Sequence, residues 1–179
     1  MDNQQETLDP FKLGWIVGVI EGEGTIGIHN GAGKGSAASY KPVIKIFNTD
    51  KDFIARCHEY LEEFGIPHYI YISNPKIVRL NKRYRELYQV TIAGFKRVKI
   101  ATEILKPEMF SSKSEQLRIL TELVNDRLST PMTRQNFGRS YTDKQLSQIE
   151  AIKQLNQRGK GSSILNDYTQ STANNAAKI

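Results

Sequence analysis

Hydrophobic residues fill seven of the ten positions from residue 11 to residue 20, and this stretch predicts a helix. Asp9 and Pro10 come directly before it, and they suit the N-cap and the first helical position. Because apolar side chains lie almost all round such a helix, we expect it to be buried rather than to lie on a surface. Gly22 and Gly24 are expected to end it.

Two strand-like stretches follow the first helix. Residues 25–29 form one and residues 40–47 the other, with a loop rich in Gly, Ala and Ser between them. In the second stretch, lysine and valine alternate with isoleucine, which predicts a strand with one apolar face. Its two faces are Lys41, Val43 and Lys45 on one side and Ile44 and Ile46 on the other.

The remainder of the chain adds two strands and four helices. Thr142 with Gln145, and Ser112 with Glu115, match the spacing of a capping box at the start of a helix. The expected elements are a helix up to residue 64, strands at 66–73 and 87–92, and helices at 95–105, 112–125 and 142–155.

This order of elements indicates an α+β fold with one four-stranded antiparallel sheet and helices on one face. The other face of the sheet is expected to be exposed. The length suits one domain, which we assign to residues 1–160. Beyond residue 159 the sequence is rich in Ser, Asn, Thr and Ala, so residues 161–179 are expected to form a flexible tail.

Composition excludes several classes of protein. Hydrophobic residues make up 39% of the chain, and no apolar run approaches the roughly 20 residues that span a bilayer. The polar start of the chain resembles neither a secretory signal nor a transit peptide. Cys57 is the only cysteine, so we expect an intracellular protein, either in the cytoplasm or nucleoid or in an organelle. No zinc site is expected, because the three histidines share no ligand spacing with Cys57.

Positive charge is concentrated in one part of the chain. The net charge is +6, and residues 76–99 hold eight basic residues and the single acid Glu86. Such a segment, interleaved with Tyr84 and Tyr88, suits a surface that binds a polyanion. A solvated strand and loop with no partner would give the same pattern, so charge alone leaves both interpretations open.

Residues 13–24 read Leu-Gly-Trp-Ile-Val-Gly-Val-Ile-Glu-Gly-Glu-Gly. This motif resembles the signature of the LAGLIDADG homing endonucleases, with Glu21 and Glu23 at the two aspartate positions. The order of helices and strands agrees as well, so the resemblance covers roughly residues 10–125. It implies a saddle-shaped sheet and an intron- or intein-encoded enzyme that cuts long DNA targets. Glutamate can replace aspartate here because either carboxylate binds a hard divalent cation.

Gly14, Gly18 and Gly22 lie four residues apart and form one smooth stripe on the first helix. Small residues let a second helix approach closely. The chain has one copy of the motif, so we expect two chains to pair through this stripe as a homodimer. A two-fold axis between the paired helices would bring both Glu23 side chains together.

Two neighbouring carboxylates repel each other unless cations lie between them. We therefore expect Mg²⁺, or another divalent cation such as Mn²⁺, bound by Glu23 and the carbonyl of Gly22. This interpretation predicts a Mg²⁺-dependent DNA endonuclease that cuts each strand once. A buried helix that only ends in a glycine-rich turn is the alternative, and it leaves the acidic pair without a purpose.

The resemblance assigns two further active-site positions. A polar residue that organises water falls on Asn48, which would otherwise only cap the next helix beside Asp50. A lysine falls on Lys113, where it would stabilise phosphate charge or polarise the attacking water. An exposed first-turn lysine is the alternative. Asp52 stands where the best-known pattern has another basic residue.

A polar antiparallel sheet fits the major groove of DNA and presents alternate side chains to the bases. The loop at residues 31–36 lacks the residues of a phosphate-binding P-loop, so its lysine is expected to reach flanking phosphates. A symmetric dimer implies a near-palindromic double-stranded target. Candidate DNA-binding residues are Thr25, His29, Lys34, Lys41, Lys45, Arg79, Arg83, Arg85 and Gln89.

Two alternative functions use the same fold. One is a maturase that binds RNA and assists splicing of its own intron, and the other is a DNA-binding regulator without catalysis. Neither requires the acidic pair, so the presence of Glu23 favours a nuclease that acts in intron homing.

Overall fold

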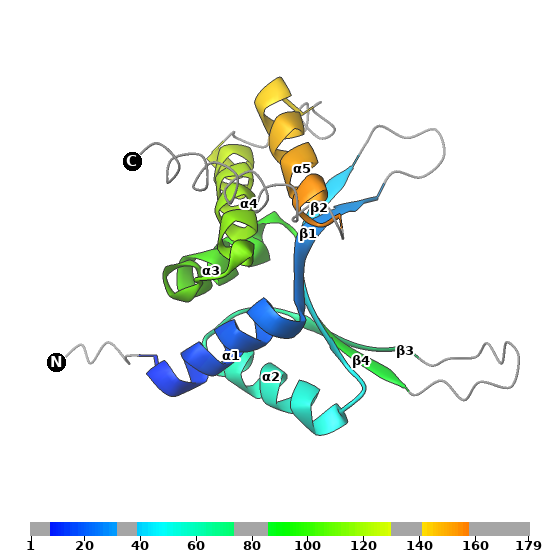
Figure 1. Cartoon of the computed structure of the whole chain (residues 1–179), viewed down its shortest axis with the longest axis vertical. Helices are drawn as coiled ribbons and strands as arrows, with labels where there is room; N and C mark the ends of the chain where they lie inside the picture. The colour runs from blue at the N-terminus through cyan, green and yellow to red at the C-terminus, as the bar shows by residue number, and fades with distance from the viewer. Residues whose placement is uncertain (1–7, 32–38, 74–85, 130–140, 158–179) are drawn as a thin grey trace, which may run out of the picture.

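The elements of the chain follow the predicted order (Figure 1). The computed structural model describes residues 8–31, 39–73, 86–129 and 141–157, and the predicted tail at 161–179 lies outside them. The elements are α1 (Pro10–Glu23), β1 (Gly24–Asn30), β2 (Tyr40–Asn48), α2 (Lys51–Glu63), β3 (Tyr69–Ser73), β4 (Leu87–Ala93), α3 (Phe95–Leu105), the 3-10 helix η1 (Lys106–Glu108), α4 (Ser112–Ser129) and α5 (Asp143–Leu155).

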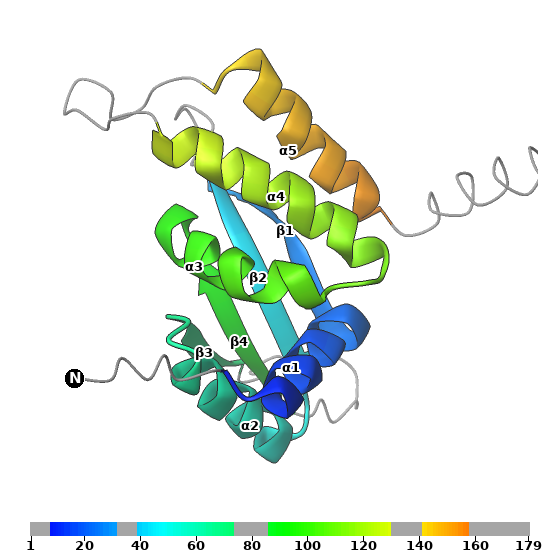
Figure 2. The ribbon, with the colours of Figure 1, turned by 90° about the vertical axis from the view of Figure 1, so that its left-hand side faces the viewer.

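The four strands form one antiparallel sheet in the order β1-β2-β4-β3. Helices α1 to α4 lie on one side of this sheet, and α5 packs against α4 and the edge strand β1 (Figures 1 and 2). No helix of the described residues lies across the other side of the sheet in Figure 1, and only the end of α5 reaches it, with Asn156 beside Gly27 of β1. The predicted α+β fold is therefore confirmed.

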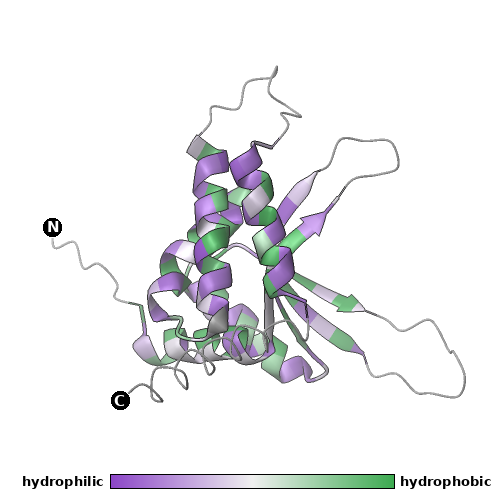
Figure 3. Ribbon diagram, turned by 45° about the horizontal axis from the view of Figure 1, so that its top comes forward, coloured by the Kyte–Doolittle hydropathy of each residue, from purple (hydrophilic) through white to green (hydrophobic). Residues whose placement is uncertain are grey.

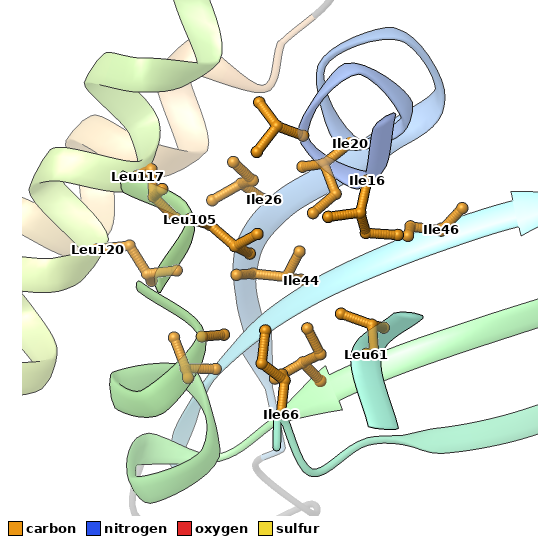
Figure 4. Packing of buried hydrophobic residues seen from close by; sticks show 14 of the residues in the cluster. Ile16, Ile20, Ile26, Ile44, Ile46, Leu61, Ile66, Leu105, Leu117 and Leu120 are labelled. Atoms are coloured by element: carbon orange, nitrogen blue, oxygen red, sulfur yellow. The ribbon is translucent and has the colours of Figure 1, made fainter. Parts of the chain in front are cut away.

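The hydrophobic core lies between the sheet and the helices (Figure 4). Alternation sends side chains such as Ile26 of β1, Ile44 of β2 and Ile92 of β4 into it, whereas the residues of β3 are exposed or half-buried. Both hydrophilic and hydrophobic residues occur along the strands (Figure 3). The most deeply buried side chains in the core include Ile16 and Ile20 of α1, Ile26 of β1, Ile44 and Ile46 of β2, and Leu117 and Leu120 of α4.

Within a single chain, one side of α1 is buried, and the side with the glycine stripe, where a second chain was predicted to pair, is exposed. Gly14, Gly18 and Gly22 are exposed, and Phe11 is exposed beside them. The apolar residues of the opposite side reach the core, whereas the glycines have no side chain to bury. Those core residues are Ile16, Val17, Val19 and Ile20.

Two other boundaries differ from the prediction by more than one residue. β3 begins at Tyr69 rather than Ile66, because the amide of Ile66 donates to the carbonyl of Leu61 and closes the end of α2. α4 continues to Ser129. The capping box of Thr142 is confirmed. At the start of α4, where a capping box of Ser112 and Glu115 was predicted, both carboxylate oxygens of Glu115 instead accept hydrogen bonds from Arg118.

Membrane crossing requires a long and apolar helix, and within the described ranges no helix meets both conditions.

Glu21 connects the end of α1 to the segment that leads into α4. Its Oε1 accepts hydrogen bonds from the amides of Phe110 and Ser111, both at 2.7 Å. These bonds, the one from Ser111 foremost, lower the pKa of Glu21 from its ordinary value of 4.5, against the opposing effect of burial. The carboxylate therefore acts as a structural anchor.

We predict that Glu21→Gln lowers the free energy of unfolding by about 1 kcal/mol at neutral pH, since the amides lose a charged acceptor. The pKa of Glu21 is depressed in the folded state, so its stabilisation is present above 4.5 and is lost as pH falls through the folded pKa. Denaturant unfolding at several pH values should show the two proteins converging in acid. Glu108→Gln, at an exposed position of η1, is the matched control. A difference that does not change with pH would contradict the anchor.

Candidate active site and nucleic-acid interface

A pocket of about 620 Å³ lies where α1 ends and β1 begins. Four parts of the chain contribute to it, and they are distant in sequence. The lining includes Gly22, Glu23, Thr25 and His29 around β1, Lys45 and Phe47 of β2, Lys113 of α4, and Lys153, Asn156 and Gln157 at the end of α5. The structure thus brings the predicted acid, the predicted lysine and part of the predicted sheet face into one place.

Glu23 is the available carboxylate of this pocket. Its side chain is exposed, and no residue of the described segments makes a hydrogen bond to it. Glu21, two residues earlier, is engaged by the backbone amides before α4. Of the two acids in the motif, Glu23 is therefore free to bind a ligand from solution.

Lys113 reaches the pocket from the first turn of α4 and is half-buried, unlike an exposed first-turn lysine. Its Nζ donates to the carbonyl of Ile20 at 2.9 Å and to that of Gly24 at 2.7 Å. Burial lowers the pKa of Lys113, while the negative charges of Glu21 and Glu23 raise it by a smaller amount. The ammonium group thus stands beside the acids at the end of α1.

Gly24 makes this close arrangement possible. A Cβ atom at this position would lie 2.6 Å from the carbonyl oxygen of Ile20, a distance that real Cβ atoms do not adopt. Any side chain would push β1 away from the last turn of α1. The glycine thus lets the strand start directly after Glu23.

Asn48 has the geometry of a helix cap. Its Oδ1 accepts a hydrogen bond from the amide of Asp50 at 2.9 Å, and Asp50 in turn accepts from Asp52 and Phe53 at the start of α2. Asn48 is not part of the pocket lining. Of its two predicted roles, the geometry favours capping, and its role in organising water stays a prediction.

The register of the sheet identifies the residues of the uncovered face. Thr25, Lys45, Thr91 and Tyr69 are neighbours in one row across the four strands. Adjacent positions such as Ile44 point to the core. Thr25, Lys41, Lys45 and His29 lie on this face as the alternation predicts, and Gln89 lies there too, where it bonds to Thr91.

His29 and Lys45 form a close pair on this face, with Nε2 of the histidine 2.7 Å from Nζ of the lysine. Since an ammonium group can only donate, the ring nitrogen of His29 accepts and the ring is neutral. Burial, Lys45 and Lys41 all lower the pKa of His29, and burial lowers that of Lys45. A closely spaced basic pair of this kind suits an anionic partner.

Sequence reasoning missed the aromatic residues of the uncovered face. Phe47, Tyr69 and Tyr71 share the face with Lys45, and Tyr71 is 60% exposed. The guanidinium of Arg97 lies 4.7 Å from the ring centroid of Tyr69. The sequence signal that could have found Phe47 is its position two residues after Lys45, since alternation puts both side chains on the same face of β2. No local sequence signal indicated that the end of α5 lines the pocket. Asn156 reaches β1 through a long-range hydrogen bond to the carbonyl of Ile26.

Lys34, Arg79, Arg83 and Arg85 lie outside the described residues. The end of the basic segment is described, and it belongs to helix α3 rather than to a strand or loop.

The glycine stripe of α1 faces open space. A Cβ atom added at Gly14, Gly18 or Gly22 would meet nothing within 4 Å. This side of α1 is thus smooth and accessible from Gly14 to Gly22, and it leads to Glu23.

Solved structures with the same fold share little sequence with this chain. The archaeal intron-encoded homing endonuclease I-Vdi141I, complexed with DNA, is 15% identical with a TM-score of 0.59, over 83% of this chain and 86% of that one. The homing endonuclease I-TnaI is 16% identical with a TM-score of 0.56, over 88% and 96%. The LAGLIDADG homing endonuclease I-GzeII, in complex with its DNA target, is 16% identical with a TM-score of 0.57, over 88% and 48%. These likenesses establish the fold.

No curated protein matches the chain significantly. The family model described as the LAGLIDADG-like domain matches residues 10–106, which is more than half of the chain. The match includes the glycine-striped helix, Glu23 and all four strands. The chain therefore belongs to the LAGLIDADG-like domain family.

Proposed function

We propose that this protein is a site-specific homing endonuclease that makes a metal-dependent double-strand break in a long, near-palindromic DNA target. The observation that carries the proposal is Glu23, an exposed carboxylate that ends a glycine-striped helix beside Lys113 and an uncovered sheet face. Structural relatives such as I-Vdi141I and I-GzeII are described in complex with DNA. The maturase and regulator alternatives gain no support from an available carboxylate.

The proposed enzyme is a homodimer that pairs through α1. Gly14, Gly18 and Gly22 leave space for a second helix to approach closely. I-TnaI is matched over 96% of its length, so chains of this size occur among proteins of this fold. I-GzeII is matched over only 48% of its length, which leaves room in that chain for a second such unit. Pairing would set the Glu23 residues of two chains next to each other.

The donor atoms at the end of α1 fit a hard divalent cation. Glu23 offers a carboxylate and Gly22 a backbone carbonyl, and oxygen ligands of this type suit Mg²⁺ or Mn²⁺. A bound cation would supply Lewis-acid stabilisation of charge on the phosphate. Lys113 keeps its ammonium group beside the same carboxylate, where it would balance negative charge on the DNA backbone.

The uncovered face would read the DNA sequence. Thr25, Lys45 and Gln89 lie on a twisted antiparallel sheet, a shape that enters the major groove. Hydrogen-bonding side chains there would contact base edges, while basic residues at its border would contact phosphates.

We predict that Glu23→Gln abolishes DNA cleavage and leaves binding to the same duplex within about twofold, since it removes a metal ligand and not a base contact. Plasmids carrying candidate insertion sites, incubated with and without Mg²⁺, measure cleavage, and a mobility shift measures binding. Glu108→Gln is the matched control at an exposed position. Cleavage by Glu23→Gln at the wild-type rate would remove Glu23 from the reaction.

We predict that Gly18→Leu converts the dimer into a folded monomer. The added side chain has open space in a single chain but would block a close approach of two helices. Analytical ultracentrifugation should show half the wild-type mass, with unchanged circular dichroism. Glu59→Leu adds the same side chain at an exposed position of α2 and should leave the dimer intact. A Gly18→Leu protein that remains dimeric would rule out pairing through the stripe.

We predict that Lys45→Ala relaxes the base preference of the enzyme at the positions that this residue contacts. The preference arises from donors that reach base edges, and each good contact discriminates by about 1–3 kcal/mol. A selection on randomised target sites measures the change. Lys51→Ala, on the exposed first turn of α2, should leave the profile unaltered. An unchanged profile for Lys45→Ala would mean that β2 does not read the target.

A further inference from the structure

Three side chains with metal-binding atoms meet beside α2, outside the pocket at Glu23. They are His58 and Glu62 of α2 and His68 just before β3. One nitrogen or oxygen atom from each lies within 4.8 Å of the other two. None of the three residues lines the pocket at the end of α1.

The local fold preorganises this cluster. His58 and Glu62 are four residues apart and so share one side of the helix. The chain then turns at Gly65, whose φ of 64° favours glycine, and the amide of Ile66 donates to the carbonyl of Leu61 at 2.8 Å. The side chain of Ile66 is buried, which fixes the turn. His68 is thereby brought back against the helix that carries the other two residues.

The protonation of His68 suits a metal ligand. Its Nδ1 lies 2.7 Å from the carbonyl oxygen of Ile66. A carbonyl oxygen can only accept, so the hydrogen is on Nδ1, and in the neutral ring Nε2 presents a lone pair. The side chain is 1% exposed, and Nε2 lies 2.7 Å from Nδ1 of His58 and 3.9 Å from Oε1 of Glu62. Histidines that bind metals commonly donate their other N–H to a backbone carbonyl in this manner.

We propose that His58, Glu62 and His68 bind a zinc-type transition metal ion. Two imidazole nitrogens and one carboxylate form a ligand set that Zn²⁺ accepts, with water in the fourth position. Without metal, Nδ1 of His58 donates the hydrogen that it shares with His68, and it would bind the ion once the ring of His58 carries its hydrogen on Nε2 instead. Two ligands at a tetrahedral zinc lie about 3.3 Å apart, so the two histidine nitrogens would separate by roughly 0.6 Å from their hydrogen-bonded distance. Glu62 has a side chain that is 64% exposed and free to adjust.

Cys57 does not belong to this site, although it is the neighbour of His58 in sequence. It is fully buried in the core, and burial raises the pKa of its thiol to about 12. The sequence expectation of no zinc site considered only ligand spacings that include this cysteine. The cluster instead combines helical spacing with a residue that returns after a turn.

The ion would fasten β3 to the end of α2. His68 directly precedes Tyr69, the first residue of β3, and the uncovered face of that strand carries Tyr69 and Tyr71. In free protein, a ligand that binds only the folded state raises the unfolding temperature. The proposal does not depend on nuclease activity, and either can fail without the other.

The test uses the full chain with the substitution Glu23→Gln, so that the carboxylate at the end of α1 does not bind the added metal. Mg²⁺ is present in excess. Titration with Co²⁺, followed by its visible absorption and by displacement with Zn²⁺, should show one ion per chain. Zn²⁺ should also raise the unfolding temperature. His58→Gln and Glu62→Gln should each weaken Co²⁺ binding by about tenfold or more, because both remove a ligand.

Both substitutions are at positions that are not fully buried, so circular dichroism should confirm that the variants fold. Glu59→Gln, an exposed carboxylate on the same helix, should bind as the parent does. Absence of Co²⁺ and Zn²⁺ binding to the parent would overturn the proposal. Parent-like affinity in either His58→Gln or Glu62→Gln would overturn it as well.

Discussion

The last turn of α1 carries a partial negative charge from its unpaired carbonyl groups, and Glu21 and Glu23 add to it. No basic residue lies in that turn to compensate. The compensation comes instead from the start of α4, where Lys113 donates to the carbonyl of Ile20 in α1 and to that of Gly24 just after it, and backbone amides bind Glu21. These contacts join α1 to α4 and leave Glu23 as the acid that can take a cation.

The same helix end determines where the sheet begins. Because Gly24 has no side chain, β1 starts against the last turn of α1, and no linker separates Glu23 from Thr25. Thr25 belongs to the row that continues through Lys45 on the uncovered face. The acid and the polar face are therefore adjacent as a consequence of chain geometry. In the proposed enzyme, this adjacency would couple the position of the cut to the bases that the sheet contacts.

The sequence predicted the elements whose limits depend on local chemistry. Asp9 and Pro10 start α1 and Asp50 starts α2, as expected from capping rules. Alternation in β2 also assigned Lys41 and Lys45 to the correct face. Each of these signals lies within a few residues of the feature that it predicts.

Other features depend on residues that are distant in sequence, and neither capping rules nor alternation indicates that such residues are close in space. Lys113 bonds to carbonyl groups about ninety residues earlier, and Asn156 reaches β1 across 130 residues. The glycine stripe was recognised from the sequence as a surface for a second chain. A single chain cannot cover it, because the helices of the same chain pack on the other side of α1.

The two proposed cation sites differ in ligand chemistry and in location. Oxygen ligands at Glu23 and Gly22 suit Mg²⁺, whereas the imidazoles of His58 and His68 prefer a zinc-type ion. The strand order β1-β2-β4-β3 places the first site beside one edge strand and His68 beside the other. An ion at His68 would therefore act on the stiffness of β3 and the position of its tyrosines. It would leave the ligands at Glu23 unchanged, so the two ions would control binding and cleavage separately.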